Sequence, residues 1–184
     1  MLVREIYLIS LCIIGKSLAY YILNMDDITI RPANAHDLVT LNQMMFDLHD
    51  EHHHQCPEYF KSASDIEEIK SIARYLDDPE CLVFVACHSD KILGFVTGHF
   101  CELISSVSKP VQMGSIDELF IEKESRRFGV ARKLCMHLEQ TFLDYGVIEV
   151  FVEVWDFNKN ALGFYTKSGF SNHIHWLRKK LVSN

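Results

Sequence analysis

One stretch of the chain constrains its fold more than any other, because a strand pattern, a tight turn and a helix pattern follow one another directly. The segment GSIDELFI, residues 114–121, predicts a strand, and the turn at residues 124–129 contains one glycine, Gly129. From about Phe128 to Tyr145 the apolar spacing predicts a helix. One face of that helix carries Val130, Leu134, Leu138 and Phe142. A strand that leads into an amphipathic helix is typical of helices packed on a sheet.

Strand and helix patterns continue on both sides of this segment. Strands are predicted at residues 28–31, 81–87, 91–100, 147–155 and about 173–179. Helices are predicted after Pro32, with Leu38, Leu41, Met45 and Leu48 on one face, and at residues 64–76 and 158–166. Residues 52–63 are expected to form a loop. The sequence therefore predicts a single α/β domain with a mixed sheet over residues 25–184.

The turn before the long predicted helix has the features of an anion-binding site. Backbone N–H groups at the start of a helix point outward and carry partial positive charge. Gly129 has no Cβ and allows close approach of a ligand, and Arg126, Arg127 and Arg132 add cationic side chains. These features fit a pyrophosphate group. Taken alone, the pattern is more typical of an ordinary strand-to-helix turn with solvated arginines.

Two further segments accompany this turn in the order and spacing of a known family. The turn contains Arg126, Arg127, Phe128, Gly129, Val130 and Ala131, the segment NKNALGFYTKSGF contains Asn158, Ala161, Tyr165, Gly169 and Phe170, and IRPANAHDL precedes both. Together they resemble the GNAT superfamily of N-acetyltransferases, whose turn motif is Arg/Gln-x-x-Gly-x-Gly/Ala. The chain departs from the family at Ala131, where glycine is commoner, and at Glu122 and Lys123, where many members have a proline. The resemblance covers residues 28 to about 180. It implies a mostly antiparallel sheet that is splayed at the cofactor site and flanked by helices.

The resemblance also implies acetyl-CoA as co-substrate. The backbone of Leu119, Phe120 and Ile121 would pair with the pantetheine arm, and N–H groups in the turn would hold the pyrophosphate. The implied cofactor-binding residues are Leu119, Phe120, Ile121, Arg126, Arg127, Phe128, Gly129, Val130, Ala131, Arg132 and Asn158. Tyr165 would stand near the sulfur and protonate the departing thiolate.

Two carboxylates compete for the role of general base, because an ammonium must lose a proton before its nitrogen can attack a thioester. Glu118 is predicted to share a strand face with Ile116 and Phe120, and Glu153 lies in the strand pattern at residues 147–155. Burial in an apolar strand raises the pKa of a carboxylate towards the range of a base. We favour Glu118, which lies beside the predicted cofactor strand. For each, the alternative is a surface carboxylate.

Histidines are concentrated in the segment HDEHHHQC at residues 49–56. A metal site needs a defined ligand spacing and a rigid scaffold, and three adjacent histidines at a helix end cannot all face one ion. We therefore expect a solvated helix end and no metal. In the GNAT fold this region walls the acceptor site. That position assigns Glu51, His53, Glu58 and Tyr59 to acceptor binding, where carboxylates favour an amine cation.

Charge and cysteine usage narrow the class of protein. A net charge of -7 argues against a dedicated nucleic-acid partner. The six cysteines are scattered without a CxxC pattern, which is typical of reduced cysteines in a cytoplasmic protein. A homodimer is compatible with the sequence.

The first 24 residues follow a different pattern from the rest of the chain. Their apolar run from Ile6 to Ile14 is broken by Gly15, Lys16 and Ser17, whereas a membrane span needs roughly 20 apolar residues. Residues 20–24 are a poor cleavage site for a signal peptide. We favour a start at Met25, which makes residues 1–24 an upstream extension. A membrane-associated helix is the second interpretation.

Together these inferences predict a cytoplasmic enzyme that moves an acetyl group from acetyl-CoA to a primary amine of a small molecule. Two alternatives stay open. The acceptor can instead be a protein N-terminus or a lysine, or the chain can be a non-catalytic acyl-CoA-binding sensor of the same fold.

Overall fold

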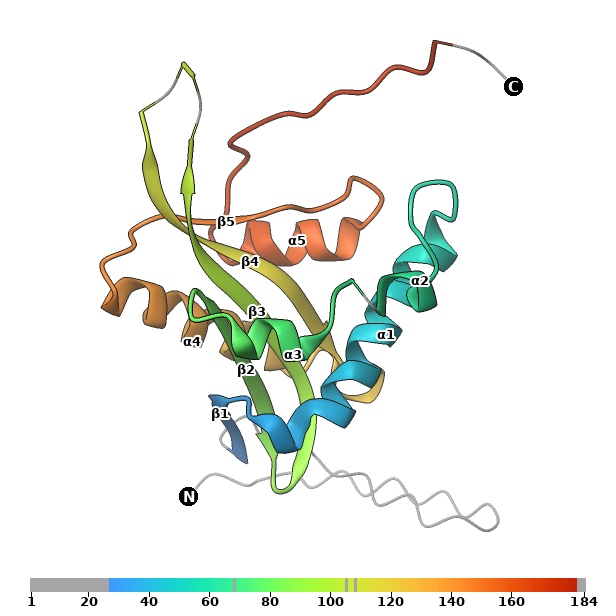
Figure 1. Cartoon of the computed structure of the whole chain (residues 1–184), viewed down its shortest axis with the longest axis vertical. Helices are drawn as coiled ribbons and strands as arrows, with labels where there is room; N and C mark the ends of the chain where they lie inside the picture. Colours follow the sequence, from blue (N-terminus) through green and yellow to red (C-terminus); the bar gives the residue numbers. More distant parts are fainter. Residues whose placement is uncertain (1–26, 68, 105, 108, 182–184) are drawn as a thin grey trace, which may run out of the picture.

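The computed structural model describes residues 27–67, 69–104, 106–107 and 109–181 (Figure 1). At its centre lies a five-stranded sheet in the order β1-β2-β3-β4-β5. The strands are β1 (Ile28–Pro32), β2 (Cys81–His88), β3 (Lys91–Leu103), β4 (Val111–Ile121) and β5 (Val150–Val152). The first four pair antiparallel with their neighbours, and β4 pairs with β5 in parallel. The predicted α/β class with a mostly antiparallel mixed sheet is confirmed.

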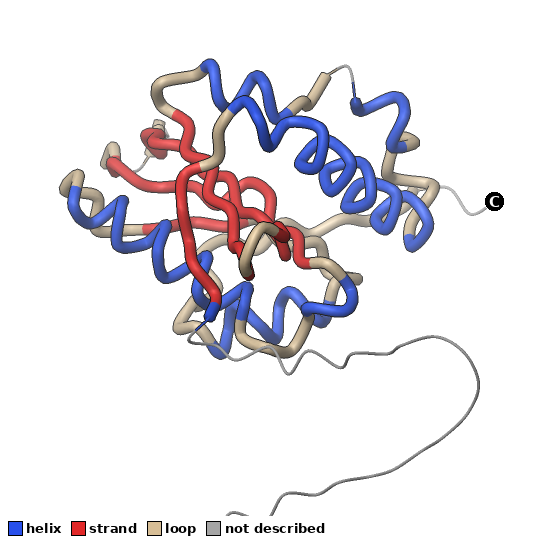
Figure 2. Tube along the Cα trace, turned by 90° about the horizontal axis from the view of Figure 1, so that it is seen from below, coloured by secondary structure: helices blue, strands red, loops and turns tan. Residues whose placement is uncertain are grey.

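Helices lie on both sides of the sheet (Figure 2). The α-helices are α1 (Leu38–Gln55), α2 (Ala63–Glu67), α3 (Ile72–Asp77), α4 (Val130–Asp144) and α5 (Lys159–Lys167). Two 3-10 turns, η2 (Ala35–Asp37) and η3 (Lys123–Ser125), precede α1 and α4. At η2, Asn34 and Asp37 form a reciprocal capping box, which fixes the entry into α1.

Two hydrophobic cores divide the sheet between them. The α1-side core contains Leu41, Met44, Met45, Leu48, Ile72, Val83, Val85, Cys87, Ile92, Phe95 and Phe120. The α4-side core contains Ile28, Phe84, Ala86, Leu93, Val96, Ile116, Ile121, Val130, Leu134, Cys135, Leu138, Phe142, Val147 and Tyr165. Successive residues of β2 alternate between the two cores, as the two-residue period of a strand requires.

Glycines in the strands let α4 approach the sheet closely. A Cβ built on Gly114 would lie 2.5 Å from Cδ2 of Phe142, and one on Gly98 would lie 3.0 Å from Cδ2 of Leu138. Both Phe142 and Leu138 are fully buried. The strand sequence therefore leaves room for the large side chains of the helix, which then fill the α4-side core at close-packed density.

One irregularity in the pairing of β3 with β4 changes the direction of side chains. Thr97 pairs with Glu118 and the next residue of β3 pairs with Ile116, so that Asp117 has no partner on β3. Such an extra residue is a β-bulge. Beyond it the alternation is shifted: Ile116 packs in the α4-side core and Phe120 in the α1-side core. The prediction that Glu118 shares a face with both is wrong, because the bulge separates it from Ile116.

Other predicted elements differ from the structure at their ends. Helix α1 continues through residues 52–55, where we expected a loop, and the predicted helix at 64–76 is two short helices, α2 and α3. The strand predicted at 147–155 is reduced to three residues, because β4 pairs with it only from Gly114 to Ile116. No strand forms at residues 173–179, which have no neighbouring strand in the sheet.

The interpretation of residues 1–24 lies outside the described residues. Among the helices that the structure describes, none is long and apolar enough to cross a membrane.

Candidate active site

The two parallel strands, β4 and β5, part at one side of the sheet, where β5 is the edge strand. The pairing of β4 with β5 begins at Gly114 with Val150 and ends at Ile116 with Val152. Beyond that point β4 continues to Ile121, past the end of the short β5 (Figure 1). The edge of β4 at residues 119–121 therefore faces the gap between the two strands, a place that we call the fork. A backbone edge of this kind can pair with an extended, amide-containing chain.

The turn after β4 adopts a left-handed backbone at two positions. The φ angle is 69° at Arg127 and 77° at Gly129, which is the N-cap of α4. The N–H groups of Val130, Ala131 and Arg132 form the first turn of α4 and have no acceptor one turn earlier in that helix. Glycine at the cap leaves their approach open. The turn therefore offers several N–H groups to one anion.

The side chain of Arg126 holds this turn against the end of β4 and against α1. Its Nε donates to the carbonyl of Ile121 at 2.8 Å, and its Nη2 donates to the carboxylate of Glu51 at 2.9 Å. The guanidinium also lies over the Phe120 ring, 5.4 Å from its centroid. Arg126 thus joins the end of β4 to α1. Arg127, Phe128 and Arg132 are exposed.

The residues of the fork and the turn fit acetyl-CoA. The edge at Leu119–Ile121 suits the amides of a pantetheine arm, and the N–H groups from Arg127 to Arg132 suit a pyrophosphate. Asn158 is the N-cap of α5, and its Oδ1 accepts from the N–H of Ala161 at 3.0 Å. The amide nitrogen of the same side chain can donate to a ligand.

Glu118 lies where the fork opens, and its side chain is only 9% exposed. Its Oε1 accepts from Nζ of Lys70 at 2.6 Å, and its backbone N–H donates to Oγ1 of Thr97 at 3.1 Å. Burial alone lowers the pKa of Lys70, but the charge of Glu118 and this hydrogen bond outweigh that effect and raise the pKa above its ordinary value. The site therefore holds an ammonium on a nearly buried carboxylate.

A small cavity of about 120 Å³ adjoins this ion pair. Its walls are Asn42, Met45, Phe46, His49, Ala63, Glu67, Lys70 and Ser71. Among the described residues, Nε2 of His49 is the buried side-chain polar atom without a hydrogen-bond partner. Burial lowers the pKa of His49, which favours the neutral ring. A ligand that enters the cavity therefore meets an imidazole nitrogen beside the Lys70–Glu118 pair.

Tyr165 lies in α5, on the other face of the sheet from Lys70. It is 6% exposed and packs in the α4-side core with Phe164 and Phe170. Burial raises the pKa of its phenol, and the charges of Cys135 and Glu118 raise it further. The phenol is thus held in its protonated form, as a hydrogen donor must be.

The second predicted carboxylate has different surroundings. Glu153 follows the last residue of β5 and is exposed. Glu118 is the buried member of the two and lies directly before the edge of β4 that faces the gap.

The residues assigned to the acceptor from the sequence have separate contacts. Glu51 binds Arg126. Nδ1–H of His53 donates to the carbonyl of Phe60 at 2.9 Å, and Arg178 lies over the ring of Tyr59, 4.1 Å from its centroid. Glu58 is exposed. The structure therefore does not gather these four side chains around one point.

Two residues that sequence reasoning missed, Lys70 and His49, lie closer to Glu118. Sequence reasoning also missed an aromatic group, in which Phe60 packs against Trp155 and Phe157 with ring centroids 4.8 and 5.6 Å apart. The helical spacing of Met45 and His49 was a signal for His49, since it places that ring on the buried face of α1. Lys70 left no such signal.

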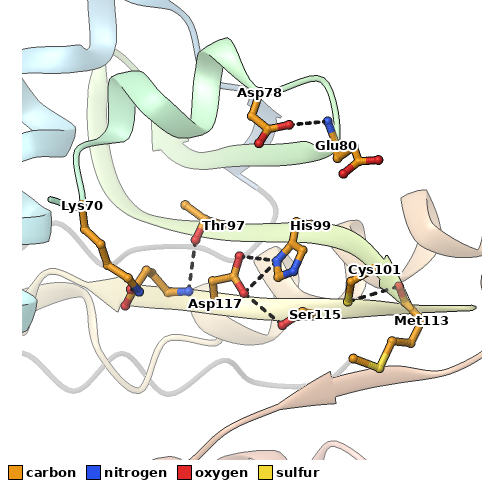
Figure 3. Close-up of polar contacts among 10 residues, drawn as sticks. Lys70, Asp78, Glu80, Thr97, His99, Cys101, Met113, Ser115 and Asp117 are labelled. Atoms are coloured by element: carbon orange, nitrogen blue, oxygen red, sulfur yellow. Dashed lines mark hydrogen bonds and ion pairs between the residues drawn. The ribbon is translucent and has the colours of Figure 1, made fainter. Parts of the chain in front are cut away.

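A polar cluster continues along the sheet from Lys70 (Figure 3). Nδ1–H of His99 donates to Oδ2 of Asp117 at 2.8 Å, and the hydroxyl of Ser115 donates to Oδ1 of Asp117 at 2.9 Å. The bulge thus places Asp117 beside His99, whereas the adjacent Glu118 forms an ion pair with Lys70. Among the described residues, no group of three or more His, Cys, Asp or Glu side chains could hold a metal ion.

Comparisons with known proteins agree with this arrangement. The chain matches the acetyltransferase (GNAT) family over residues 45–170. Among solved structures, an acetyltransferase from Vibrio fischeri shares 61% identity, with 69% of this chain and 96% of that chain covered and a TM-score of 0.58. Among curated proteins, no sequence matches the chain.

More distant structures share the fold alone. A tetramutant of the BH1408 protein from Bacillus halodurans has 18% identity and a TM-score of 0.72, covering 83% of this chain and 99% of that chain. An aminoglycoside acetyltransferase from an uncultured soil sample has 20% identity and a TM-score of 0.59, covering 86% and 99%. With the family match over most of the domain and the 61% identical structure, the chain belongs to the acetyltransferase (GNAT) family.

Proposed function

We propose that the chain transfers an acetyl group from acetyl-CoA to a primary amine of a small molecule. The observation that carries this proposal is the nearly buried Glu118 at the fork, with an ammonium 2.6 Å from its carboxylate. A buried carboxylate selects a cation and can accept its proton. The cavity of about 120 Å³ beside it favours a slender acceptor over a bulky one.

The side chains divide the proton transfers between the two faces of the sheet. When bound, acetyl-CoA supplies the thioester carbonyl that an amine attacks. Glu118 removes a proton from the acceptor's ammonium on the α1 side. Tyr165, whose pKa is raised by burial, keeps its proton until a thiolate needs it on the α4 side. Positioning of the two substrates at the fork supplies a further share of the rate.

A lysine side chain of a protein is the second candidate acceptor. The specific observation in its favour is that the ammonium found on Glu118 is itself that of a lysine, Lys70. Nucleic-acid acceptors are disfavoured by the net charge of -7. We place the activity in the cytoplasm, in accord with the scattered cysteines.

The test measures acetyl-CoA consumption across a panel of small amines and lysine peptides. Glu118→Gln keeps the shape of the side chain and removes the base. We expect kcat to fall by ~10²–10⁴-fold, with partial rescue at high pH where the amine arrives deprotonated. Glu153→Gln is the matched control and should retain activity. Tyr165→Phe should lower kcat in the same range with little change in acetyl-CoA affinity.

Two results would count against this assignment. If Glu153→Gln loses the acidic limb of the pH–rate profile and Glu118→Gln keeps it, Glu153 is the base. If acetyl-CoA binds tightly and no amine is acetylated, the chain is a non-catalytic acyl-CoA-binding sensor.

A further inference from the structure

A lysine of the chain itself occupies the position proposed for the acceptor. Nζ of Lys70 is 2.6 Å from Oε1 of Glu118, and these residues are 48 positions apart in the sequence. The Lys70 side chain is 47% exposed and that of Glu118 is 9% exposed. A primary ammonium thus reaches the proposed base from the solvent side. An acceptor amine would arrive in the same way.

The backbone around this lysine is anchored on both sides. The N–H of Lys70 donates to the carbonyl of Ile66 at 2.8 Å, and the N–H of Ile72 donates to Oδ1 of Asn42 at 3.3 Å. The second bond ties the segment to α1. Because its starting point is fixed, the side chain has a high effective concentration at Glu118.

A purely structural role accounts poorly for this ion pair. Desolvation of a buried carboxylate offsets most of the Coulombic gain of such a pair, and a half-exposed lysine is screened by solvent. The pair also borders a cavity in which Nε2 of His49 has no partner among the described residues. Both features are expected of a site that exchanges its occupant.

We propose that Lys70 is an acetyl acceptor within the same chain, so that the protein acetylates its own Lys70 when no other amine is present. This inference rests on the proposed function. Glu118 takes one proton from the ammonium, and the freed lone pair of Nζ forms a bond to the thioester carbonyl carbon. The C–S bond breaks, its electron pair stays on sulfur, and the thiolate takes a proton from Tyr165. The second proton of the attacking nitrogen passes to the Tyr165 phenolate, directly or through water, and Glu118 releases its proton to water. The products are an amide on Lys70, free CoA and one proton in solution.

The experiment follows acetylation of the purified full chain with acetyl-CoA and no added amine. Peptides are quantified by mass spectrometry over time, and the exposed Lys61 and Lys91 report uncatalysed acetylation in the same sample. We expect Lys70 to react ~10²-fold or more faster than these two lysines, as base catalysis allows. The rate constant should not change when the protein is diluted, because the reaction is intramolecular.

Three variants sharpen the result. Lys70→Arg retains a cation for Glu118 and should leave only the slow acetylation of exposed lysines. Lys91→Arg is the matched control and should keep the fast modification of Lys70. Glu118→Gln should slow acetylation of Lys70 towards the rate of Lys91.

The inference and the proposed function can fail separately. Acetylation of Lys70 no faster than that of Lys91 overturns the inference, and so does a rate that rises with protein concentration. If amines in the panel are acetylated and Lys70 is not, the proposed function stands without it. If acetyl-CoA binds and neither the amines nor Lys70 react, both are wrong.

Discussion

Gly129 offers the sharpest test of the cofactor site, because a substitution there has two effects that can be measured separately. One is backbone strain, which lowers stability, and the other is obstruction of the ligand, which lowers affinity. Its φ of 77° is left-handed, and a valine there would cost roughly 1–2 kcal/mol of stability. The side chain would also stand between a pyrophosphate and the first N–H groups of α4. Loss of one hydrogen bond to a charged acceptor is worth about 1.5–3 kcal/mol. We therefore expect Gly129→Val to weaken acetyl-CoA binding by roughly 10- to 150-fold.

A second glycine on the same helix provides the matched control. Gly146 follows the other end of α4 with a φ of 85°, and a Cβ built there meets nothing within 4 Å. Gly146→Val should therefore lose a similar stability in urea unfolding and keep its affinity for acetyl-CoA. Calorimetric titration of both variants separates strain from binding. Equal affinities for the two folded variants would refute the assignment of the pyrophosphate to this turn.

Two further predictions concern stability. Gly114→Ala places a Cβ 2.5 Å from the Phe142 ring and should lower the free energy of unfolding by about 1–3 kcal/mol; Gly163→Ala, whose Cβ meets nothing within 4 Å, should not destabilise, and equal unfolding midpoints for the two would contradict the packing. The hydrogen bond from Arg31 holds the pKa of Asp37 below its ordinary value of 3.8, so its stabilisation is complete above that pH and is lost as the pH falls through the lowered pKa. The free energy of unfolding of Asp37→Asn, measured at a series of pH values, should not show this loss of stability in acid. If its dependence on pH is the same as that of the natural chain, the loss belongs to other carboxylates.

The sequence predicted those elements whose partners lie in a regular pattern. Two apolar runs joined by a hairpin turn identified β2 and β3, and helical spacing identified α4 with Leu134, Leu138 and Phe142 buried. Strand β5 was overestimated because alternation describes side chains, whereas a strand also needs a hydrogen-bonded neighbour. That neighbour, β4, diverges after Ile116. Tertiary geometry therefore decided the length of β5.

The site was predictable to a lesser extent. Glu118 and Tyr165 stand on elements with strong patterns; Glu118 was nominated from its place beside the predicted cofactor strand, and Tyr165 from the family resemblance. Lys70 could not, because one lysine in a polar segment carries no periodicity, and its partner lies in a different element. The end of α1 at Gln55 was also missed. Near that end Nδ1–H of His52 donates to the carbonyl of Leu48, one turn earlier, at 2.8 Å.

The single extra residue in β4 determines which face of the sheet each side chain after it occupies. Before Asp117 the even-numbered positions, such as Ile116, enter the α4-side core, whereas after it the odd-numbered Ile121 does so. Removing Asp117 would restore a uniform parity. Glu118 would then follow Ile116 directly and keep its place opposite Thr97 on the α1 side, whereas His99 would lose the carboxylate beside it. The extra residue therefore gives one side of the sheet two adjacent acids, Asp117 on His99 and Glu118 on Lys70, where a regular strand would offer one.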